Sequence, residues 1–206
     1  MTTHRKELRS LPLQARSKAT LEHLLNTAME ILESEGFEAF NTNLLADRAG
    51  VGVRAIYRYF PNKLAILVML AERMREQELI WIGDFSEAAK AGDWQEMIDI
   101  AIDRYYAGAM KQPGMVALRA AIRVVPELRA IEAEASRSFQ KNLAVALEQL
   151  GVTLGHAHMA ALCQTIIDAS TAMLDAALVS SPAHARRLLD ELKRMIRNLL
   201  ADYVDA

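Results

Sequence analysis

Along most of this chain, apolar residues recur every three or four positions, the spacing that places them on one face of an α-helix. Only five prolines and few runs of β-branched residues interrupt this pattern. We therefore expect an all-α protein of about nine helices, with three small helices first and six in a larger bundle. The predicted helices cover roughly residues 14–35, 42–49, 53–59, 63–82, 94–110, 115–124, 126–150, 153–179 and 182–200.

Residues that cap helices stand before several of these segments. Asn41, Asn62 and Thr153 each have a side-chain oxygen that can accept an N–H of a first helical turn. Asp93 followed by Glu96 resembles a capping box. These residues predict where the helices begin.

Residues 41–63 contain two short predicted helices that are separated by a tight turn. Gly50 allows the positive φ that stops a helix, and Gly52 adds a flexible joint. In the second helix, Ile56 and Phe60 are four residues apart and form an apolar stripe. Two short helices joined by a turn of about three or four residues form the helix-turn-helix, whose second helix enters the major groove of DNA.

The polar residues of the second short helix have the chemistry that reading DNA requires. Arg54 and Arg58 share one face, and arginine can bond guanine through two N–H groups. On an isolated helix these arginines would be read as ordinary surface charges. Inside a helix-turn-helix the functional interpretation is favoured, because such residues meet base edges. The remaining candidate contacts are Asn43, Val53, Ala55, Tyr57 and Tyr59.

Residues 16–67 resemble the DNA-binding domain of the tetracycline-repressor (TetR) family of bacterial transcription regulators. The resemblance implies phosphate contacts by Tyr57 and Lys63. Two positions depart from the family pattern, because Gly52 stands where a capping Ser or Thr is usual and Leu64 where an acidic residue is common. The matching positions are Ala28, Ile31, Leu32, Gly36, Phe37, Leu45, Ala46, Ala49, Gly50, Val51, Ile56, Tyr57, Tyr59, Phe60, Lys63 and Leu67.

We expect three regions along the chain. Residues 1–12 are polar and basic and are expected to form a flexible arm. Residues 13–61 are expected to form the helix-turn-helix domain, and residues 62–206 a domain for ligand binding and dimerisation.

The last two predicted helices are apolar over more than one face, which has two explanations. They could form a buried hairpin within one chain, or pair with their copies in a second chain. The resemblance implies pairing into a homodimer, and a two-fold operator requires a two-fold protein. The expected interface residues are Leu188, Leu192, Met195 and Leu199.

The central helices are rich in methionine and aromatic residues, which suit either a core or a pocket for an apolar effector. The expected pocket residues are Trp81, Tyr105, Phe139 and Ile167. Asp168 shares a face with Asp175, Gln164 and Thr171. That polar face either meets solvent or forms the polar side of the pocket.

Composition excludes several other classes of protein. No stretch of about 18 uncharged apolar residues predicts a membrane span, and no apolar segment predicts a secretory signal. A single cysteine, Cys163, suits the reducing cytoplasm. His156 and His158 are two residues apart and face different sides of a helix, so no metal pair is expected. We expect neither catalysis nor a cofactor.

Net charge is −2, but residues 1–63 carry nine Lys/Arg against seven Asp/Glu. Local positive charge suffices for phosphate contact. Together with the TetR resemblance, the sequence predicts a ligand-responsive, dimeric transcription repressor of the bacterial cytoplasm and nucleoid. The alternative is a ligand-binding or scaffold protein that no longer regulates DNA.

Overall fold

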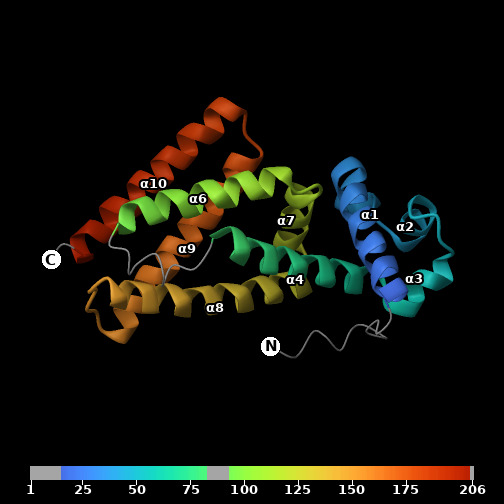
Figure 1. The fold of residues 1–206 in the computed structure, drawn as a ribbon, viewed down its shortest axis with the longest axis horizontal. Coiled ribbons are helices and arrows are strands. Elements are labelled where there is room, and N and C mark those ends of the chain that lie inside the picture. The colour runs from blue at the N-terminus through green and yellow to red at the C-terminus, as the bar shows by residue number, and fades with distance from the viewer. Residues whose placement is uncertain (1–14, 83–92, 205–206) are drawn as a thin grey trace. The chain divides into compact units, whose positions relative to one another are not determined.

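The computed structural model describes residues 15–82 and 93–204, and within these ranges every regular element is an α-helix (Figure 1). The predicted all-α class is confirmed. The predicted arm, residues 1–12, lies outside the described residues. The described helices are α1 (Ala15–Ala39), α2 (Thr42–Arg48), α3 (Val53–Tyr59), α4 (Lys63–Ile82), α6 (Trp94–Lys111), α7 (Met115–Val124), α8 (Pro126–Gln149), α9 (His156–Leu178) and α10 (Pro182–Val204).

The chain divides into two compact units. The first unit comprises residues 1–75 and 112–132, and the second comprises residues 76–111 and 133–206. Helices α4 and α8 each begin in the first unit and continue into the second. The first unit also contains α7, which lies far along the sequence from α1 to α3. A division of the chain after residue 61 therefore stays a prediction.

The first unit is built on α1, which packs against α2 and α7. The apolar side chains of this unit are buried as their spacing predicts, because each amphipathic helix turns one face toward the same core. Gly36, with φ of 79° and ψ of 175°, interrupts α1 close to the predicted end of that helix. The completely buried side chains of this core include Leu24, Ile31, Leu45, Ile56, Phe60, Ile66 and Leu118.

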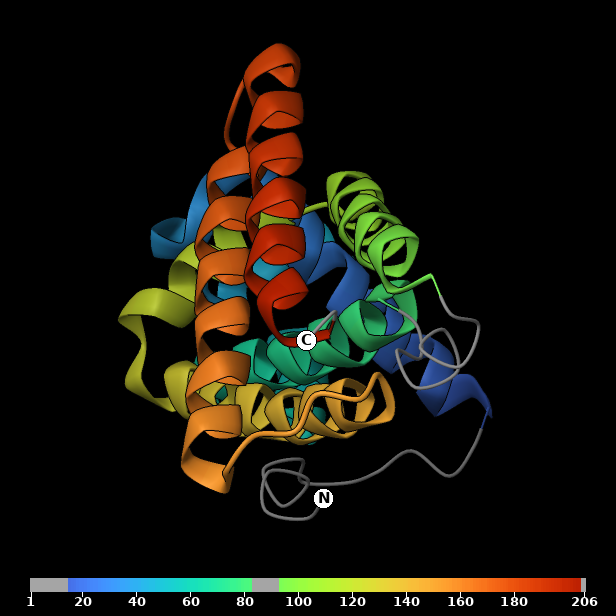
Figure 2. The ribbon, with the colours of Figure 1, turned by 90° about the vertical axis from the view of Figure 1, so that its left-hand side faces the viewer.

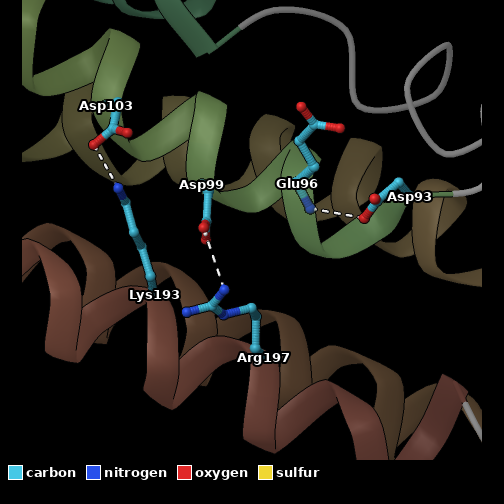
Figure 3. Close-up of polar contacts among 6 residues, drawn as sticks. All are labelled: Asp93, Glu96, Asp99, Asp103, Lys193 and Arg197. Atoms are coloured by element: carbon cyan, nitrogen blue, oxygen red, sulfur yellow. Dashed lines mark hydrogen bonds and ion pairs between the residues drawn. The ribbon is translucent and has the colours of Figure 1, made fainter.

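The predicted helix starts at Asn62 and Asp93 are confirmed. The Asn62 side chain accepts the N–H of Ala65 at 2.9 Å, at the beginning of α4. The Asp93 carboxylate accepts the N–H of Glu96 at 2.9 Å, at the beginning of α6 (Figure 3).

The predicted start of the long helix after residue 150 is wrong. Helix α9 begins at His156, and its N-cap is Gly155, which has no side-chain acceptor. The Thr153 hydroxyl instead donates to the carbonyl oxygen of Gly151 at 3.3 Å. A threonine can cap a turn as readily as a helix, so its identity alone does not specify the helix start.

In the second unit, α9 and α10 lie side by side (Figure 2), and α6 packs against both. Two ion pairs join α6 to α10, as Figure 3 shows. The Lys193 ammonium lies 2.6 Å from the Asp103 carboxylate, and the Arg197 guanidinium lies 3.2 Å from that of Asp99. No helix among the described residues is long and apolar enough to cross a membrane.

Candidate nucleic-acid interface

The turn between α2 and α3 has the geometry that its glycine predicts. Helix α2 starts with Asn41, whose side-chain oxygen accepts the N–H groups of Asn43 at 3.0 Å and Leu44 at 2.9 Å. After α2 ends at Arg48, Gly50 has φ of 63° and the Val51 N–H donates to the carbonyl of Ala46 at 3.0 Å. Because these bonds close both ends of α2, the direction in which α3 leaves the turn is well defined.

Helix α3 is supported by a completely buried face. Ile56 and Phe60 are both buried, which confirms the predicted apolar stripe. The Phe60 N–H donates to the Ile56 carbonyl at 2.9 Å and closes the helix. A seven-residue helix is marginal by itself, so this packing must hold it in place.

The opposite face of α3 is open and basic. Arg54 and Arg58 are exposed, and 41% of the Tyr57 side chain is accessible. Val53 and Ala55 are half-buried beside them. The structure therefore brings five of the predicted contact residues together on one short helix, where guanidinium, phenol and methyl groups can meet a DNA groove.

Helix α2 adds two polar residues next to this face. Asn43 is exposed in its first turn, as a contact residue must be. Thr42 was not predicted as a contact residue, yet its hydroxyl lies 3.4 Å from that of Tyr57. The signal in the sequence was its position directly after the Asn41 cap, where a hydroxyl lies at the start of α2 and can bond a phosphate oxygen.

Tyr59 does not share this exposure, which corrects the expectation that it contacts DNA. Only 1% of the residue is accessible, and its hydroxyl lies 2.8 Å from that of Ser17 on α1. The hydrogen bond with Ser17 lowers the pKa of Tyr59, helped by Arg58 and opposed by burial. Tyr59 is therefore a core residue that attaches α3 to α1.

Arg58 is held in place by the same tyrosine. Its guanidinium donates to the Tyr59 hydroxyl at 3.2 Å and lies 5.1 Å from the centre of the Tyr59 ring. A guanidinium held over an aromatic ring keeps several N–H groups for other acceptors. Arg58 thus keeps N–H donors on the exposed face that it shares with Arg54.

Lys63, at the start of α4, has partners within the protein. Its ammonium donates to the carbonyl oxygen of Phe37 at 3.0 Å and lies 4.5 Å from the centre of the Phe37 ring. The Phe40 ring lies further away, at 5.8 Å. Burial lowers the pKa of Lys63. A carbonyl and two aromatic rings therefore offset the cost of a cation at a helix N-terminus, and a phosphate is not needed to explain it.

The predicted pocket residues lie in the second unit, and two of them are buried. Tyr105 on α6 is 6% exposed, and Ile167 on α9 is also buried. The Tyr105 hydroxyl donates to the carboxylate of Glu78 on α4 at 2.7 Å. Glu78 is only 3% exposed and was missed by the sequence analysis. Its position four residues after the buried Met74 was the available signal.

The other predicted pocket residues differ in their surroundings. Phe139 is half-buried on α8. Trp81 lies in the last turn of α4, and its side chain is outside the described part of the structure. Asp168 is exposed and accepts a hydrogen bond from the Gln164 amide at 2.7 Å. Exposure in the single chain favours the solvent-facing alternative for Asp168, and its place in a pocket stays a prediction.

The predicted interface residues on α10 fall into two groups. Met195 is 38% exposed, and Leu188 and Leu199 are half-buried, so all three present apolar surface. Leu192 is 0% exposed and is enclosed by its own unit. A side chain without accessible surface cannot contact a second chain, so Leu192 is a core residue and not an interface residue.

Metal and thiol chemistry find no support in the described residues. No group of three or more His, Cys, Asp or Glu side chains among them could hold a metal ion. Cys163 is completely buried, and burial raises the pKa of its thiol, so the reactive thiolate is disfavoured.

Comparison with known families matches both parts of the chain. Residues 24–70 match the model described as "Bacterial regulatory proteins, tetR family". Residues 92–204, more than half of the chain, match "Tetracyclin repressor-like, C-terminal domain". The chain belongs to the TetR family. This is a family of transcription regulators and not of enzymes.

Individual relatives agree with this assignment. The tetracycline repressor protein class C of Escherichia coli is 43% identical over 58 residues, which span 28% of this chain and 26% of the relative. A TetR-family regulator from Streptomyces coelicolor has the same fold, with a TM-score of 0.65 and 21% identity over 89% of this chain and 99% of that one.

A second solved structure of this fold contains a small molecule. SmeT, which represses the multidrug efflux pump SmeDEF of Stenotrophomonas maltophilia, is known as a complex with triclosan. The complex has a TM-score of 0.65 and 18% identity, covering 90% of this chain and 92% of SmeT. At this identity the likeness concerns the fold.

Proposed function

We propose that this TetR-family chain is a ligand-responsive transcription repressor that binds a two-fold DNA operator as a homodimer. The observation that carries the proposal is the exposed face of α3, where Arg54, Tyr57 and Arg58 stand on a helix whose other face is completely buried. Insertion into a major groove requires a helix that is held by one buried face and presents basic side chains on the other.

The proposed contacts divide into base reading and phosphate binding. Arg54 and Arg58 supply paired N–H donors for guanine, and Val53 and Ala55 supply methyl groups for thymine. Thr42, Tyr57 and Lys63 are proposed to bind phosphates, and Asn43 is a further candidate for contact with a base. Lys63 would use the N–H groups that its bond to Phe37 leaves over, since an ammonium has three.

The dimer is proposed to form through α9 and α10. Leu188, Met195 and Leu199 give α10 an apolar strip that one chain leaves partly exposed, and Val179 is exposed at the end of α9. Burying such apolar surface against a second copy is favourable. A two-fold dimer would then carry two copies of α3 for the two half-sites of an operator.

The effector is proposed to be an apolar small molecule bound in the second unit. Tyr105 and Ile167 are buried there, and the Glu78–Tyr105 pair supplies polar groups in an apolar interior, as ligand pockets do. The triclosan complex of SmeT shows that a protein of this fold holds a small molecule. Helix α4 runs from the first unit into the second and is the proposed lever between effector and DNA.

Selection of bound fragments from genomic DNA, followed by gel shifts over a salt series, tests the DNA part of this proposal. A regulator should recover a small set of fragments with a shared two-fold sequence, and its affinity should fall steeply with salt. Titration with hydrophobic compounds, followed by tryptophan fluorescence and release of DNA, tests the effector part.

The second candidate is a ligand-binding or scaffold protein that no longer regulates DNA. It is supported by Gly52, which leaves the start of α3 without a side-chain cap. For this candidate we expect that some compounds change the tryptophan emission and that no DNA fragment is recovered above background.

If the protein is a transcription regulator, we propose that it acts in the cytoplasm, at the nucleoid.

A further inference from the structure

Helix α7 begins in direct contact with the backbone of α1. Gly114, its N-cap, is buried and has φ of 70° and ψ of 0°. The Gly114 N–H donates to the Glu33 carboxylate of α1 at 2.6 Å. A Cβ atom at this glycine would lie 2.4 Å from the carbonyl oxygen of Met29. Only glycine fits both this backbone conformation and this approach.

The contact satisfies the backbone donor of the N-cap of α7, where no side chain of the chain's own N-cap forms a hydrogen bond. Gly114 has no side chain to accept the N–H groups of the first turn. The Glu33 carboxylate takes one donor at the start of α7 and brings a negative charge to the positive end of the helix dipole. A charged acceptor makes this a strong hydrogen bond.

Apolar packing extends the contact along α7. Met115, Leu118 and Ile122 are buried, and α7 packs on α1 within the first unit. The two helices are therefore joined by a polar contact at one end and by apolar side chains along their length.

The chain just before this contact leads into the other unit. Helix α6 ends at Lys111 and belongs to the second unit, whereas the chain from Gln112 onward belongs to the first. Only residues 112–114 separate α6 from α7, and one of them is Pro113. A connection this short and stiff passes on a displacement of the α6 end instead of absorbing it.

We propose that Glu33 and Gly114 are positioning residues that fasten the α6–α7 corner to α1. Their contact holds one end of the α6–α7 connection, which, like α4 and α8, joins the ligand-binding unit to the unit that contains the DNA-reading helices. The effect on operator binding rests on the function proposed above, whereas the fastening itself does not. Because coupling is reciprocal, loosening the contact should change both the amide exchange of α6 and the affinity for DNA.

Hydrogen exchange of the free full-length protein tests the fastening. In Glu33→Ala, exchange at the Gly114 amide should accelerate about tenfold, the change that corresponds to loss of roughly one hydrogen bond. The last turn of α6 should also exchange faster. Glu33→Gln, which keeps an acceptor, should fall between Glu33→Ala and wild type. Glu30→Ala is the matched control, because it removes an exposed acid from the same helix. Unchanged exchange at Gly114 and α6 in Glu33→Ala would overturn the proposal.

DNA binding supplies the second arm, with a duplex recovered by genomic selection as the probe. Glu33→Ala should bind it about fivefold more weakly, with an unchanged salt slope because no phosphate contact is lost. Stronger binding by both Glu33→Ala and Glu30→Ala would reveal only the removal of negative charge and would overturn the positioning role.

The two arms separate this proposal from the proposed function. If wild type binds no fragment, the function as a DNA regulator fails, while the exchange arm still decides whether Glu33 fastens the corner. If wild type binds DNA and the exchange arm is negative, only the positioning role fails.

Discussion

Neighbouring side chains on α3 have opposite surroundings, and this difference decides what each can do. Arg58 is exposed and keeps N–H groups for a ligand, whereas Tyr59 is buried against Ser17. The chemistry of the two residues made both of them candidates for DNA contact. Which of the two faces solvent follows from the rotation of α3 on its apolar stripe, since successive residues on a helix point in different directions.

Arg54→Ala should weaken binding to a selected operator by about 1–3 kcal/mol, because arginine bonds a guanine through two N–H groups. Preference at one base pair of each half-site should relax at the same time. Competition gel shifts with single-base operator variants would measure both effects. Arg104→Ala, an exposed arginine on α6, is the control and should bind like wild type. Equal losses across all base variants would mean that Arg54 binds backbone and reads no base.

Lys63→Met separates a structural role of Lys63 from a role in phosphate binding, because each role affects a different measured quantity. The free energy of unfolding should fall by about 1–3 kcal/mol, because the bond to the Phe37 carbonyl and the aromatic contact are lost. The salt slope of operator binding should fall by about one if the ammonium also binds a phosphate. Urea denaturation and a salt series measure the two. A stability loss with an unchanged slope would restrict Lys63 to a structural role.

At the scale of single residues, the sequence predicted the type of chemistry and left its orientation open. Arg54, Tyr57 and Asn43 are exposed as predicted contact residues should be. Tyr59 and Leu192 are placed differently from the prediction. Both lie where one helical turn separates buried from exposed positions, and a sequence pattern locates that limit to within only about one residue.

At the scale of the helices, the conformation of single residues decides where each helix begins and ends. The turn before α3 shows this, because its two glycines differ in backbone conformation. Gly50 has φ of 63°, which a side chain tolerates poorly, whereas Gly52 has φ of −70° and ψ of 143°, which any residue adopts. A Cβ atom would meet nothing within 4 Å at either position. The two glycines therefore differ in backbone conformation and not in available space.

Replacement by serine should therefore change the free energy of unfolding in opposite directions at Gly52 and Gly50. Gly52→Ser should raise the free energy of unfolding by about 0.5–1 kcal/mol, because it restricts the unfolded chain and supplies a cap for α3. Gly50→Ser should lower it by about 1–2 kcal/mol, because serine pays for the left-handed conformation. Urea denaturation of both variants tests the pair, each serving as the control for the other. A stabilised Gly50→Ser would contradict the assigned turn geometry.

At the scale of the whole molecule, α10 shows why burial has to be known before an interface is tested. Leu192 and Met195 are three residues apart, yet the first is enclosed by its own unit and the second is partly exposed. A charge at Leu192 would disrupt the core, and loss of dimers would then follow from unfolding. The exposed strip around Met195 is therefore the place to test assembly.

Met195→Glu should leave the fold intact and turn the protein into monomers, because a charge would have to be buried at the proposed interface. Light scattering measures the mass, and circular dichroism measures the helix content. Leu192→Ala is the contrast, since it should cost about 2–5 kcal/mol of stability through the cavity it leaves. A Met195→Glu protein that remains dimeric would place the interface on another surface.

The sequence by itself determined the all-α class, the helix-turn-helix and the TetR family, because these rest on local signals. Apolar spacing specifies a helix face, Asn41 and Gly50 specify helix ends, and the short motif lies within one continuous segment. Only the tertiary structure decided which side chains are accessible and which distant helices meet. It buried Tyr59 and Leu192, paired Glu78 with Tyr105, and seated Gly114 on α1. These outcomes depend on packing between residues far apart in the chain, which no local pattern encodes.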